Sequence, residues 1–236
     1  MSIKLSFIVP CHNEKDWLPK LLLSLNSCET RFEEIEFVVV DNASSDRTVD
    51  SLWELVPSLK YRVKLVHELR KGVSAARNTG ALVAKGEVLV FVDADNILTQ
   101  HFVDQLWFVT RSPDFCGATI RTLAEAGSLK GAMVFNILEI IKLLLPRPFG
   151  KSVAKKAAFL AIGGFDERVK LGENVVFTSR LKAFALRNGE KFLHIKSPVY
   201  ASLRRFEKVG YVKILFPWLV AYLGVRSLPY ETVDNL

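Results

Sequence analysis

Two carboxylates one residue apart follow an uninterrupted apolar run. Residues 88–92 read Val-Leu-Val-Phe-Val, and Asp93 and Asp95 come directly after them. The run predicts a strand buried on both faces. Two carboxylates at its end repel each other, so a cation or several hydrogen-bond donors must compensate. Mg²⁺ and Mn²⁺ often combine one or two carboxylates with substrate phosphates. We therefore expect Asp93 and Asp95 to bind a divalent ion that holds a diphosphate, with a simple polar turn as the alternative.

The elements that must position these carboxylates alternate along the chain. Apolar runs at residues 5–10, 36–41 and 61–67 predict three further strands, and residues 18–25 and 72–84 have helical spacing. Alternating strands and helices predict an α/β fold with a mostly parallel sheet and right-handed crossovers. The strands would then direct His12, Asn13, Asp41 and the two carboxylates to one edge. Ligands bind in the crevice at that edge in open α/β sheets.

Composition narrows the class of partner. The chain has 236 residues, half of them hydrophobic, and a net charge of +7. That charge favours an anionic partner such as a phosphorylated substrate or a membrane surface. There is no nucleic-acid-binding motif, so no nucleic-acid partner is expected. The three cysteines are scattered and the N-terminus lacks a signal-peptide pattern, which together predict a cytoplasmic protein without a disulfide framework.

Four motifs in order carry a family resemblance. The first half of the chain resembles the nucleotide-binding half of a family 2 glycosyltransferase, an enzyme with the A-type glycosyltransferase fold. The motifs are Val9-Pro10-x-x-Asn13-Glu14, Val40-Asp41-Asn42-x-Ser44-x-Asp46, Ala75-Ala76-Arg77-Asn78-x-Gly80 and Asp93-x-Asp95. The resemblance implies a nucleotide-diphosphate sugar donor, with a UDP-sugar favoured, and Mn²⁺ or Mg²⁺ as cofactor.

The resemblance also implies roles for individual residues. Asp41 would accept a hydrogen bond from the ring N–H of a uracil-type base, Arg77 would lie near the base or phosphates, and Asp95 would coordinate the metal. Asp93 would lie near the ribose and the metal. The nucleotide-binding set is Pro10, His12, Asn13, Glu14, Asp41, Arg77, Asp93 and Ala94. Plainer alternatives are a turn cap for Asp41, a surface helix residue for Arg77 and a loop residue for His12.

The acceptor side contains a departure from the family pattern. Residues 163–167, Gly-Gly-Phe-Asp-Glu, resemble the family's acceptor-side segment, and Glu173-Asn174 stands where the family usually has Glu-Asp. In inverting members that Asp is the general base, and an amide cannot accept a proton at neutral pH. Glu173 could serve instead, or the acceptor could already be ionised. The third reading is an inactive site, which would make the chain a non-catalytic nucleotide-sugar-binding subunit.

Arg204 and Arg205 resemble the arginine-bearing lid of small membrane-associated family members. Two guanidiniums near a diphosphate would stabilise the charge that develops on the leaving group. The alternative is a basic pair on the surface. His194 is a conceivable further metal ligand, although a lone His in a strand is more often structural.

Two apolar segments in the second half suggest contact with lipid. Residues 131–145 have only Asn136, Glu139 and Lys142 as polar members, and residues 209–225 are apolar apart from Lys213. The first segment predicts either a helix in a lipid interface at the inner face of the membrane or a core helix under the sheet. The second could lie on a membrane, pack on the core or contact another subunit. We expect a glycosyltransferase domain over 1–205, divided into a nucleotide-binding half, 1–98, and an acceptor-side half, 99–205, with an apolar tail, 206–236. The acceptor would be a glycan or a lipid-linked molecule.

Overall fold

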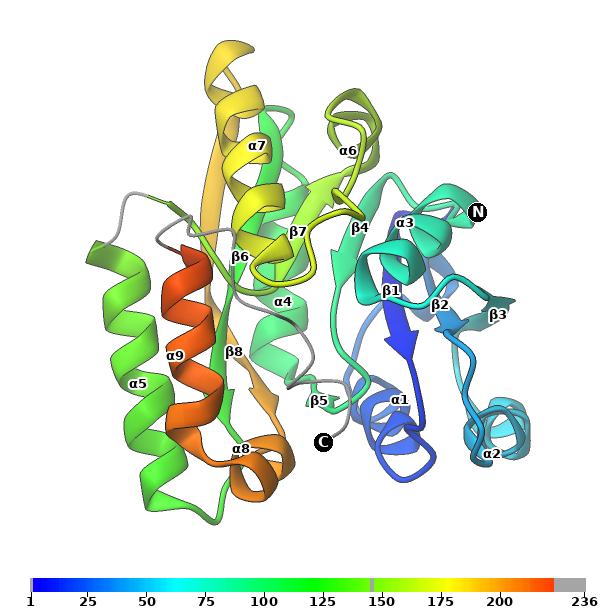
Figure 1. The fold of residues 1–236 in the computed structure, drawn as a ribbon. Helices are drawn as coiled ribbons and strands as arrows, with labels where there is room; N and C mark the ends of the chain where they lie inside the picture. The colour runs from blue at the N-terminus through cyan, green and yellow to red at the C-terminus, as the bar shows by residue number, and fades with distance from the viewer. Residues whose placement is uncertain (1, 145–146, 223–236) are drawn as a thin grey trace.

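The structure is a computed structural model that describes residues 2–144 and 147–222. One eight-stranded sheet runs through it in the order β3-β2-β1-β4-β7-β6-β8-β5 (Figure 1). The strands are β1 (Leu5–Cys11), β2 (Ile35–Asp41), β3 (Arg62–His67), β4 (Val88–Phe91), β5 (Asn96–Ile97), β6 (Phe115–Ala124), β7 (Ser152–Lys155) and β8 (Lys191–Ala201).

Helices cover both faces of this sheet. They are α1 (Leu18–Asn26), α2 (Thr48–Leu55), α3 (Val73–Val83), α4 (Gln100–Thr110), α5 (Leu129–Leu144), α6 (Lys156–Ala161), α7 (Glu173–Arg187), α8 (Arg204–Val209) and α9 (Tyr211–Tyr222), with short 3-10 turns η1 (Phe32–Glu34) and η2 (Val56–Ser58). One apolar core joins α1, α2 and α4 to one face, and a second joins α3, α6 and α7 to the other. Alternation along β1 explains the division, since Phe7 and Val9 enter the first core and Ile8 enters the second.

The first four strands form the predicted parallel unit. The neighbouring pairs β3–β2, β2–β1 and β1–β4 are all parallel, and β1, β2 and β4 are apolar because helices bury them on both sides. Gly80 lets α3 lie close to the sheet, because a Cβ there would come within 2.6 Å of the Ile8 side chain. The carboxyl ends of these strands therefore share one edge.

The second half makes the sheet mixed. Strand β7 pairs antiparallel with both β4 and β6, and β5 pairs antiparallel with β8, while β6 and β8 are parallel. The α/β fold is confirmed, but its parallel part lies mainly in the first half. Nothing in the alternating pattern of the first 98 residues predicts the reversal at β7, because strand direction there is set by long-range pairing.

A third apolar cluster holds α5, α8 and α9 against the ends of β6 and β8. It includes Phe135, Phe206 and Ile214. In Figure 1, α5 and α9 stand side by side at one end of the sheet. No helix within the described ranges is long and apolar enough to span a membrane. The predicted tail is described only as far as residue 222, where it forms α8 and α9, and the remainder of it lies outside the described residues.

Candidate functional site

Asp41 lies at the carboxyl end of β2, with His67 opposite it at the end of β3. Its Oδ2 is 3.3 Å from His67 Nδ1, and its Oδ1 accepts a hydrogen bond from the Ser44 backbone N–H at 3.2 Å. The next residue, Asn42, donates to the carbonyls of Glu68 and Arg70. These contacts fix the strand end, so that a buried carboxylate and an imidazole face the same edge of the sheet.

The loop after β1 is fastened to the loop after β2. His12 Nδ1 lies 2.9 Å from the Asn42 carbonyl oxygen. Asn13 adopts a positive φ of 58° and its Oδ1 accepts from the backbone N–H groups of Ser45 and Asp46. Asn tolerates this left-handed conformation better than most residues. The structure thus brings Pro10, His12, Asn13 and Asp41 to neighbouring positions at one edge.

Arg77 connects the two halves of the site from the interior. Its guanidinium donates to Asp93 Oδ1 at 3.0 Å, Glu173 Oε1 at 3.1 Å and Asn174 Oδ1 at 3.3 Å. It also stacks over Phe165, 5.2 Å from the ring centre. The side chain is 5% exposed, so the surface alternative for Arg77 is wrong. A buried guanidinium with these partners fixes the carboxylates of both halves.

Lys151 is a site residue that the sequence analysis did not identify. Its Nζ lies 3.0 Å from Asp93 Oδ2, on the side of the carboxylate opposite Arg77. Strand pairing explains this position, because β7 runs antiparallel to β4 with Ser152 opposite Phe91. The two residues are far apart in sequence, and no local pattern marks the lysine.

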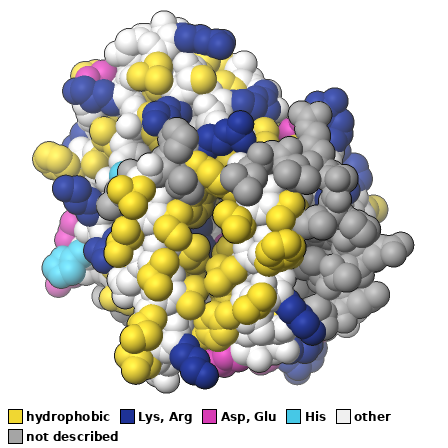
Figure 2. Space-filling model, turned by 60° about the vertical axis from the view of Figure 1, so that its left-hand side comes forward, with side chains coloured by type: hydrophobic (Ala, Val, Ile, Leu, Met, Phe, Trp, Pro, Cys, Tyr) yellow, Lys and Arg dark blue, Asp and Glu magenta, His cyan; other side chains and the backbone are white. Residues whose placement is uncertain are grey.

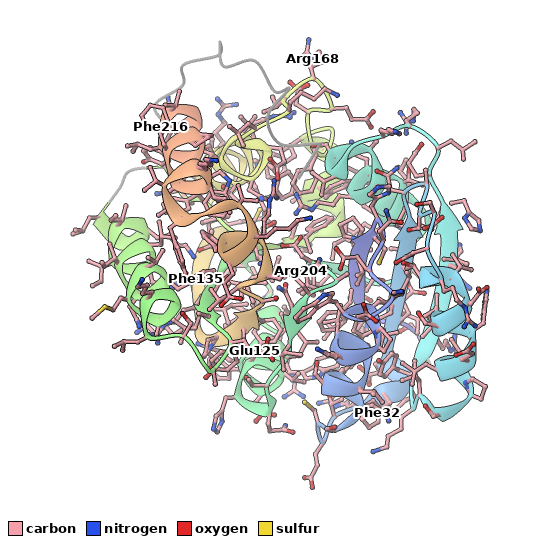
Figure 3. The ribbon with its side chains drawn as sticks, turned by 60° about the horizontal axis from the view of Figure 1, so that its bottom comes forward. Phe32, Glu125, Phe135, Arg168, Arg204 and Phe216 are labelled. Atoms are coloured by element: carbon pink, nitrogen blue, oxygen red, sulfur yellow. The ribbon has the colours of Figure 1, made fainter. Side chains whose placement is uncertain are left out.

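Arg204 reaches the site from the start of α8. Its Nη2 is 2.5 Å from each carboxylate oxygen of Glu14, and its Nε is 4.0 Å from Asp95 Oδ2. Its guanidinium also lies over the Trp17 ring, at 5.1 Å. Figure 3 shows Arg204 extending from α8 toward the strands of the first half. Arg205 is exposed on the same helix, and the structure does not bring it to the carboxylates.

The acidic residues of the site differ in their proton affinity. Burial, reinforced by Asp95 and Asp93, raises the pKa of Glu14 to about 7 in spite of Arg204. For Asp93 burial acts in the same direction, but Lys151 and Arg77 outweigh it and lower the pKa well below its usual value. The pKa of Asp95 is raised, first by burial and then by Asp93. A further cation near Asp95 would therefore be favourable.

The carboxylate of Asp95 fits a divalent ion whose other ligands are water and substrate oxygens. Asp93 already accepts from two cationic side chains, whereas Asp95 accepts from the Asn96 amide at 3.1 Å and has Arg204 at 4.0 Å. In the described part of the chain, no cluster of three or more His, Cys, Asp or Glu residues could hold a metal alone. Mg²⁺ and Mn²⁺ sites with one or two carboxylates complete their shell with water and phosphate oxygens. His194 lies elsewhere, against Thr119 and Glu139.

The predicted acceptor-side segment lines a cavity beside Arg77. The cavity has a volume of about 590 Å³, and Phe165, Glu167, Arg168 and Arg180 are among its lining residues. Gly164 has a φ of +66°, and a Cβ there would come within 2.6 Å of Asn78 Oδ1. This glycine therefore allows the segment to lie directly against α3. Phe165, which lines the cavity and stacks on Arg77, connects it to the carboxylate cluster.

Comparisons with known proteins give the family of the chain. Residues 6–122, about half of the chain, match the model of the family described as glycosyl transferase family 2. Glycosyltransferase GlyA of Streptococcus pneumoniae is 28% identical over 78% of this chain and 23% of its own length. The poly(ribitol-phosphate) β-N-acetylglucosaminyltransferase TarS of Staphylococcus aureus is 27% identical over 88% of this chain and 37% of its own length. The chain thus spans less than two fifths of the length of each of these relatives.

Solved structures show the same fold. The S. aureus TarS fragment 1–349 in complex with UDP-GlcNAc superposes with a TM-score of 0.68 at 22% identity, over 85% of this chain and 58% of that one. The mannosyltransferase PcManGT of Pyrobaculum calidifontis, in complex with GDP-Man and Mn²⁺, gives a TM-score of 0.69 at 19% identity, over 97% and 66% of the two chains.

Proposed function

The chain belongs to glycosyl transferase family 2, and from this premise we propose that it transfers a sugar from a nucleotide-diphosphate sugar to an acceptor. The observation that carries the proposal is the meeting of two halves of the chain at one sheet edge. Arg77 holds Asp93 from the first half and Glu173 from the second, and Arg204 reaches Glu14 across 190 positions. Acidic and cationic groups in one crevice suit a metal-bound diphosphate.

The donor is proposed to be a UDP-sugar. Asp41 would accept from the ring N–H of uracil, and His67 and the loop of residues 10–14 lie at the same strand ends. Arg204, near Glu14, and Lys151, near Asp93, would contact the diphosphate, with Arg205 as a further cation beside them in the sequence. Asp95, with Asp93 behind it, would hold Mg²⁺ or Mn²⁺, and a bound ion of this kind neutralises charge on the departing nucleotide diphosphate.

The general base is proposed to be Glu173, with inversion at the sugar. Glu173 Oε1 accepts from Arg77 and from the Asn174 amide at 3.0 Å, which fixes the carboxylate at the start of α7. The Asn174 Oδ1 accepts from Arg77 and cannot take up a proton. Pairing with a guanidinium makes a carboxylate a weaker base. An acceptor that is already ionised, such as a phosphate group of a glycan or a lipid-linked molecule, would need little assistance.

The two halves of the chain are proposed to bind different substrates. We assign the base and ribose of the nucleotide to residues 1–98 and the acceptor to residues 99–205, with Lys151 and Arg204 of the second half contacting the diphosphate. The cavity beside Arg168 and Arg180 offers cationic groups to an anionic acceptor. Residues 206–236 would form the apolar tail, and the protein would work at the cytoplasmic face of a membrane. The named function of TarS, transfer to a ribitol-phosphate polymer, is one precedent for an acceptor rich in phosphate.

Thermal-shift binding tests the donor site directly. UDP, GDP, TDP and CMP would each be added with and without Mn²⁺ to the full chain and to Asp95→Asn. We expect one nucleotide to raise the melting temperature in a Mn²⁺-dependent manner and the variant to lose that dependence. A folded protein that responds to no nucleotide would contradict the proposal.

The second candidate function is a non-catalytic nucleotide-sugar-binding subunit, which Asn174 favours. The two candidates differ in turnover. A catalytic chain releases UDP from its donor, slowly to water and faster with an acceptor, and Glu173→Gln lowers that rate. A binding subunit shows the thermal shift without release, and Asn174→Asp would create the activity.

A further inference from the structure

Helix α5 buries two charged residues, Glu139 and Lys142, and exposes a row of apolar residues. Glu139 and Lys142 are each 8% exposed, whereas Leu129, Met133, Ile137, Ile140, Ile141 and Leu144 are 37–78% exposed. The six apolar residues follow one another at spacings of one, three or four positions and share one face of the helix. A surface helix in water has the opposite arrangement. The outer face of α5 is therefore suited to an apolar environment.

The inward charges of α5 contact each other and the backbone of β6, while Glu139 Oε2 is buried without a hydrogen-bond partner. Lys142 Nζ lies 2.5 Å from Glu139 Oε1 and donates to the Ile120 carbonyl at 3.2 Å. The same Glu139 oxygen accepts from the Thr122 backbone N–H at 3.0 Å. The pair thus anchors α5 to β6 by polar contacts, in addition to the apolar contact of Phe135 with the third cluster. The six exposed apolar side chains of α5 take no part in either contact and remain available for a partner.

Helix α9 extends the same surface. Its exposed residues include Val212, Phe216, Trp218 and Leu219, and Phe216 is 59% exposed. Phe135 of α5 and Trp218 of α9 both pack edge-on against Phe206, which joins the two helices. Beyond the end of α5, the Arg147 backbone N–H donates a hydrogen bond to the Tyr222 hydroxyl, and its guanidinium donates to the Tyr222 carbonyl. Figure 2 shows the two helices as adjacent hydrophobic rows, and Figure 3 shows Phe216 on the outer side of α9.

Cationic side chains lie at the ends of this apolar surface. Lys130 lies at the start of α5, Lys213 near the start of α9 and Arg147 beyond the far end of α5, and all are exposed. Figure 2 shows Lys and Arg side chains below and above the hydrophobic rows. In a symmetric dimer through this face, each set of cations would meet a set of the same sign. Anionic lipid headgroups complement these cations, and acyl chains complement the apolar rows.

We propose that α5 and α9 together form a docking surface for an anionic lipid bilayer. The helices lie in the interface with their apolar rows in the headgroup–acyl boundary, and the terminal cations contact the headgroups. Helix α8 connects this surface to the site, since it carries Phe206 against Phe135 and Arg204 against Glu14. Docking holds the crevice beside the bilayer surface. That this delivers an acceptor rests on the proposed function, but the docking itself does not.

Vesicle co-sedimentation of the full chain tests the docking surface. The vesicles are phosphatidylcholine with phosphatidylglycerol and, for comparison, phosphatidylcholine alone. Ile137→Gln/Phe216→Gln removes two exposed apolar side chains from the surface, and Leu82→Gln/Phe108→Gln removes two even more exposed ones from α3 and α4. We expect binding to the anionic vesicles, a loss of about tenfold or more in the first variant, and little change in the second. Lys130→Glu/Lys213→Glu should weaken binding to the anionic vesicles by a similar factor.

Three outcomes would overturn the proposal. They are no binding to the anionic vesicles, an equal loss in both apolar variants, and a wild-type dimer in sedimentation equilibrium that Ile137→Gln/Phe216→Gln dissociates. The last result would assign the face to a second copy. Nucleotide thermal shifts are measured on the same variants, where they should match the wild type. A chain that binds vesicles but no nucleotide would contradict the proposed function and leave the docking surface intact.

Discussion

Arg77 and Lys142 are both buried cations, each with a side chain that is 5% exposed, yet they organise different kinds of surface. Arg77 binds the carboxylates of Asp93 and Glu173, and the Asp93 side chain is 39% exposed. Lys142 binds the carboxylate of Glu139, whose side chain is 10% exposed, and a strand carbonyl. The first cluster therefore has carboxylate oxygens accessible to a ligand, whereas the second is closed.

The comparison shows that burial of an ion pair does not by itself identify a site. Breaking either pair should be harmful, because a buried charge without its partner is strongly destabilising. Only the first pair should matter for a ligand, because Asp93 is exposed at the sheet edge whereas Glu139 is buried. Substitutions in the two pairs should therefore separate loss of stability from loss of ligand binding.

Replacing Arg77 should have the largest consequence. Arg77→Met leaves Asp93 and Glu173 without their shared partner, so the free energy of unfolding should fall by roughly 3–5 kcal/mol. Nucleotide binding should weaken by more than about 100-fold, since the two halves of the crevice are no longer aligned. Urea unfolding and isothermal titration calorimetry measure the two effects. Arg47→Met, at a site with a 71% exposed side chain, is the control, and equal behaviour of the two variants would refute the role given to Arg77.

The Glu139–Lys142 pair should affect stability alone. Glu139→Leu leaves a buried ammonium without its carboxylate and should lower the unfolding free energy by roughly 3 kcal/mol. Glu139→Leu/Lys142→Met should recover most of this loss, because well-packed apolar residues can replace a buried ion pair. Nucleotide affinity should match the wild type in both variants. A double variant less stable than the single one would show that the pair has another function.

Replacing Lys151 should weaken the binding of a nucleoside diphosphate more than that of a monophosphate. Lys151→Met removes one of the two cations on Asp93 and a proposed phosphate contact, so affinity for a nucleoside diphosphate should fall about tenfold. The matching nucleoside monophosphate should be affected less, because fewer phosphate oxygens are lost. Calorimetry with both ligands measures the difference. Lys170→Met, an exposed lysine outside the carboxylate cluster, serves as the control, and a uniform effect on both ligands would count against the phosphate contact.

Glu14 should produce a smaller effect that depends on pH. Its pKa is about 7 in the fold against an ordinary value of 4.5, so the folded chain holds this proton more tightly than the unfolded chain. Stability from this group is therefore present below pH 4.5 and is lost as the pH rises to 7. Glu14→Gln keeps a neutral side chain, so its stability relative to wild type should rise by roughly 1–3 kcal/mol between pH 4.5 and 8. Melting temperatures across this range measure it. Glu33→Gln is the exposed control. A stability difference between Glu14→Gln and the wild type that does not change with pH would refute the shifted pKa of Glu14.

The sequence predicted the elements of the nucleotide-binding half within one or two residues at most ends. The periodicity of residues 5–10 and 36–41 suffices, because strands buried on both faces need continuous apolar runs. It also predicted which residues the structure brings to one edge, namely Asp41, Asp93 and the loop after β1. It could not predict Lys151 or His67, because each reaches its carboxylate through strand pairing. The roles given to Glu173, Asn174 and Arg205 stay predictions.

Residues 131–145 illustrate most clearly what a sequence leaves open. Their composition determines that a helix here has a narrow polar stripe and a wide apolar face, but a stripe can face water or the sheet. The tertiary structure turned Glu139 and Lys142 toward β6, where a strand amide donates to Glu139 Oε1 and a strand carbonyl accepts from Lys142. Local periodicity specifies the faces of a helix, whereas the partners that can satisfy a buried charge come from distant strands. The sequence alone thus determined the strands, the carboxylates at their ends and the amphipathic helices, and the fold decided which of their faces are buried.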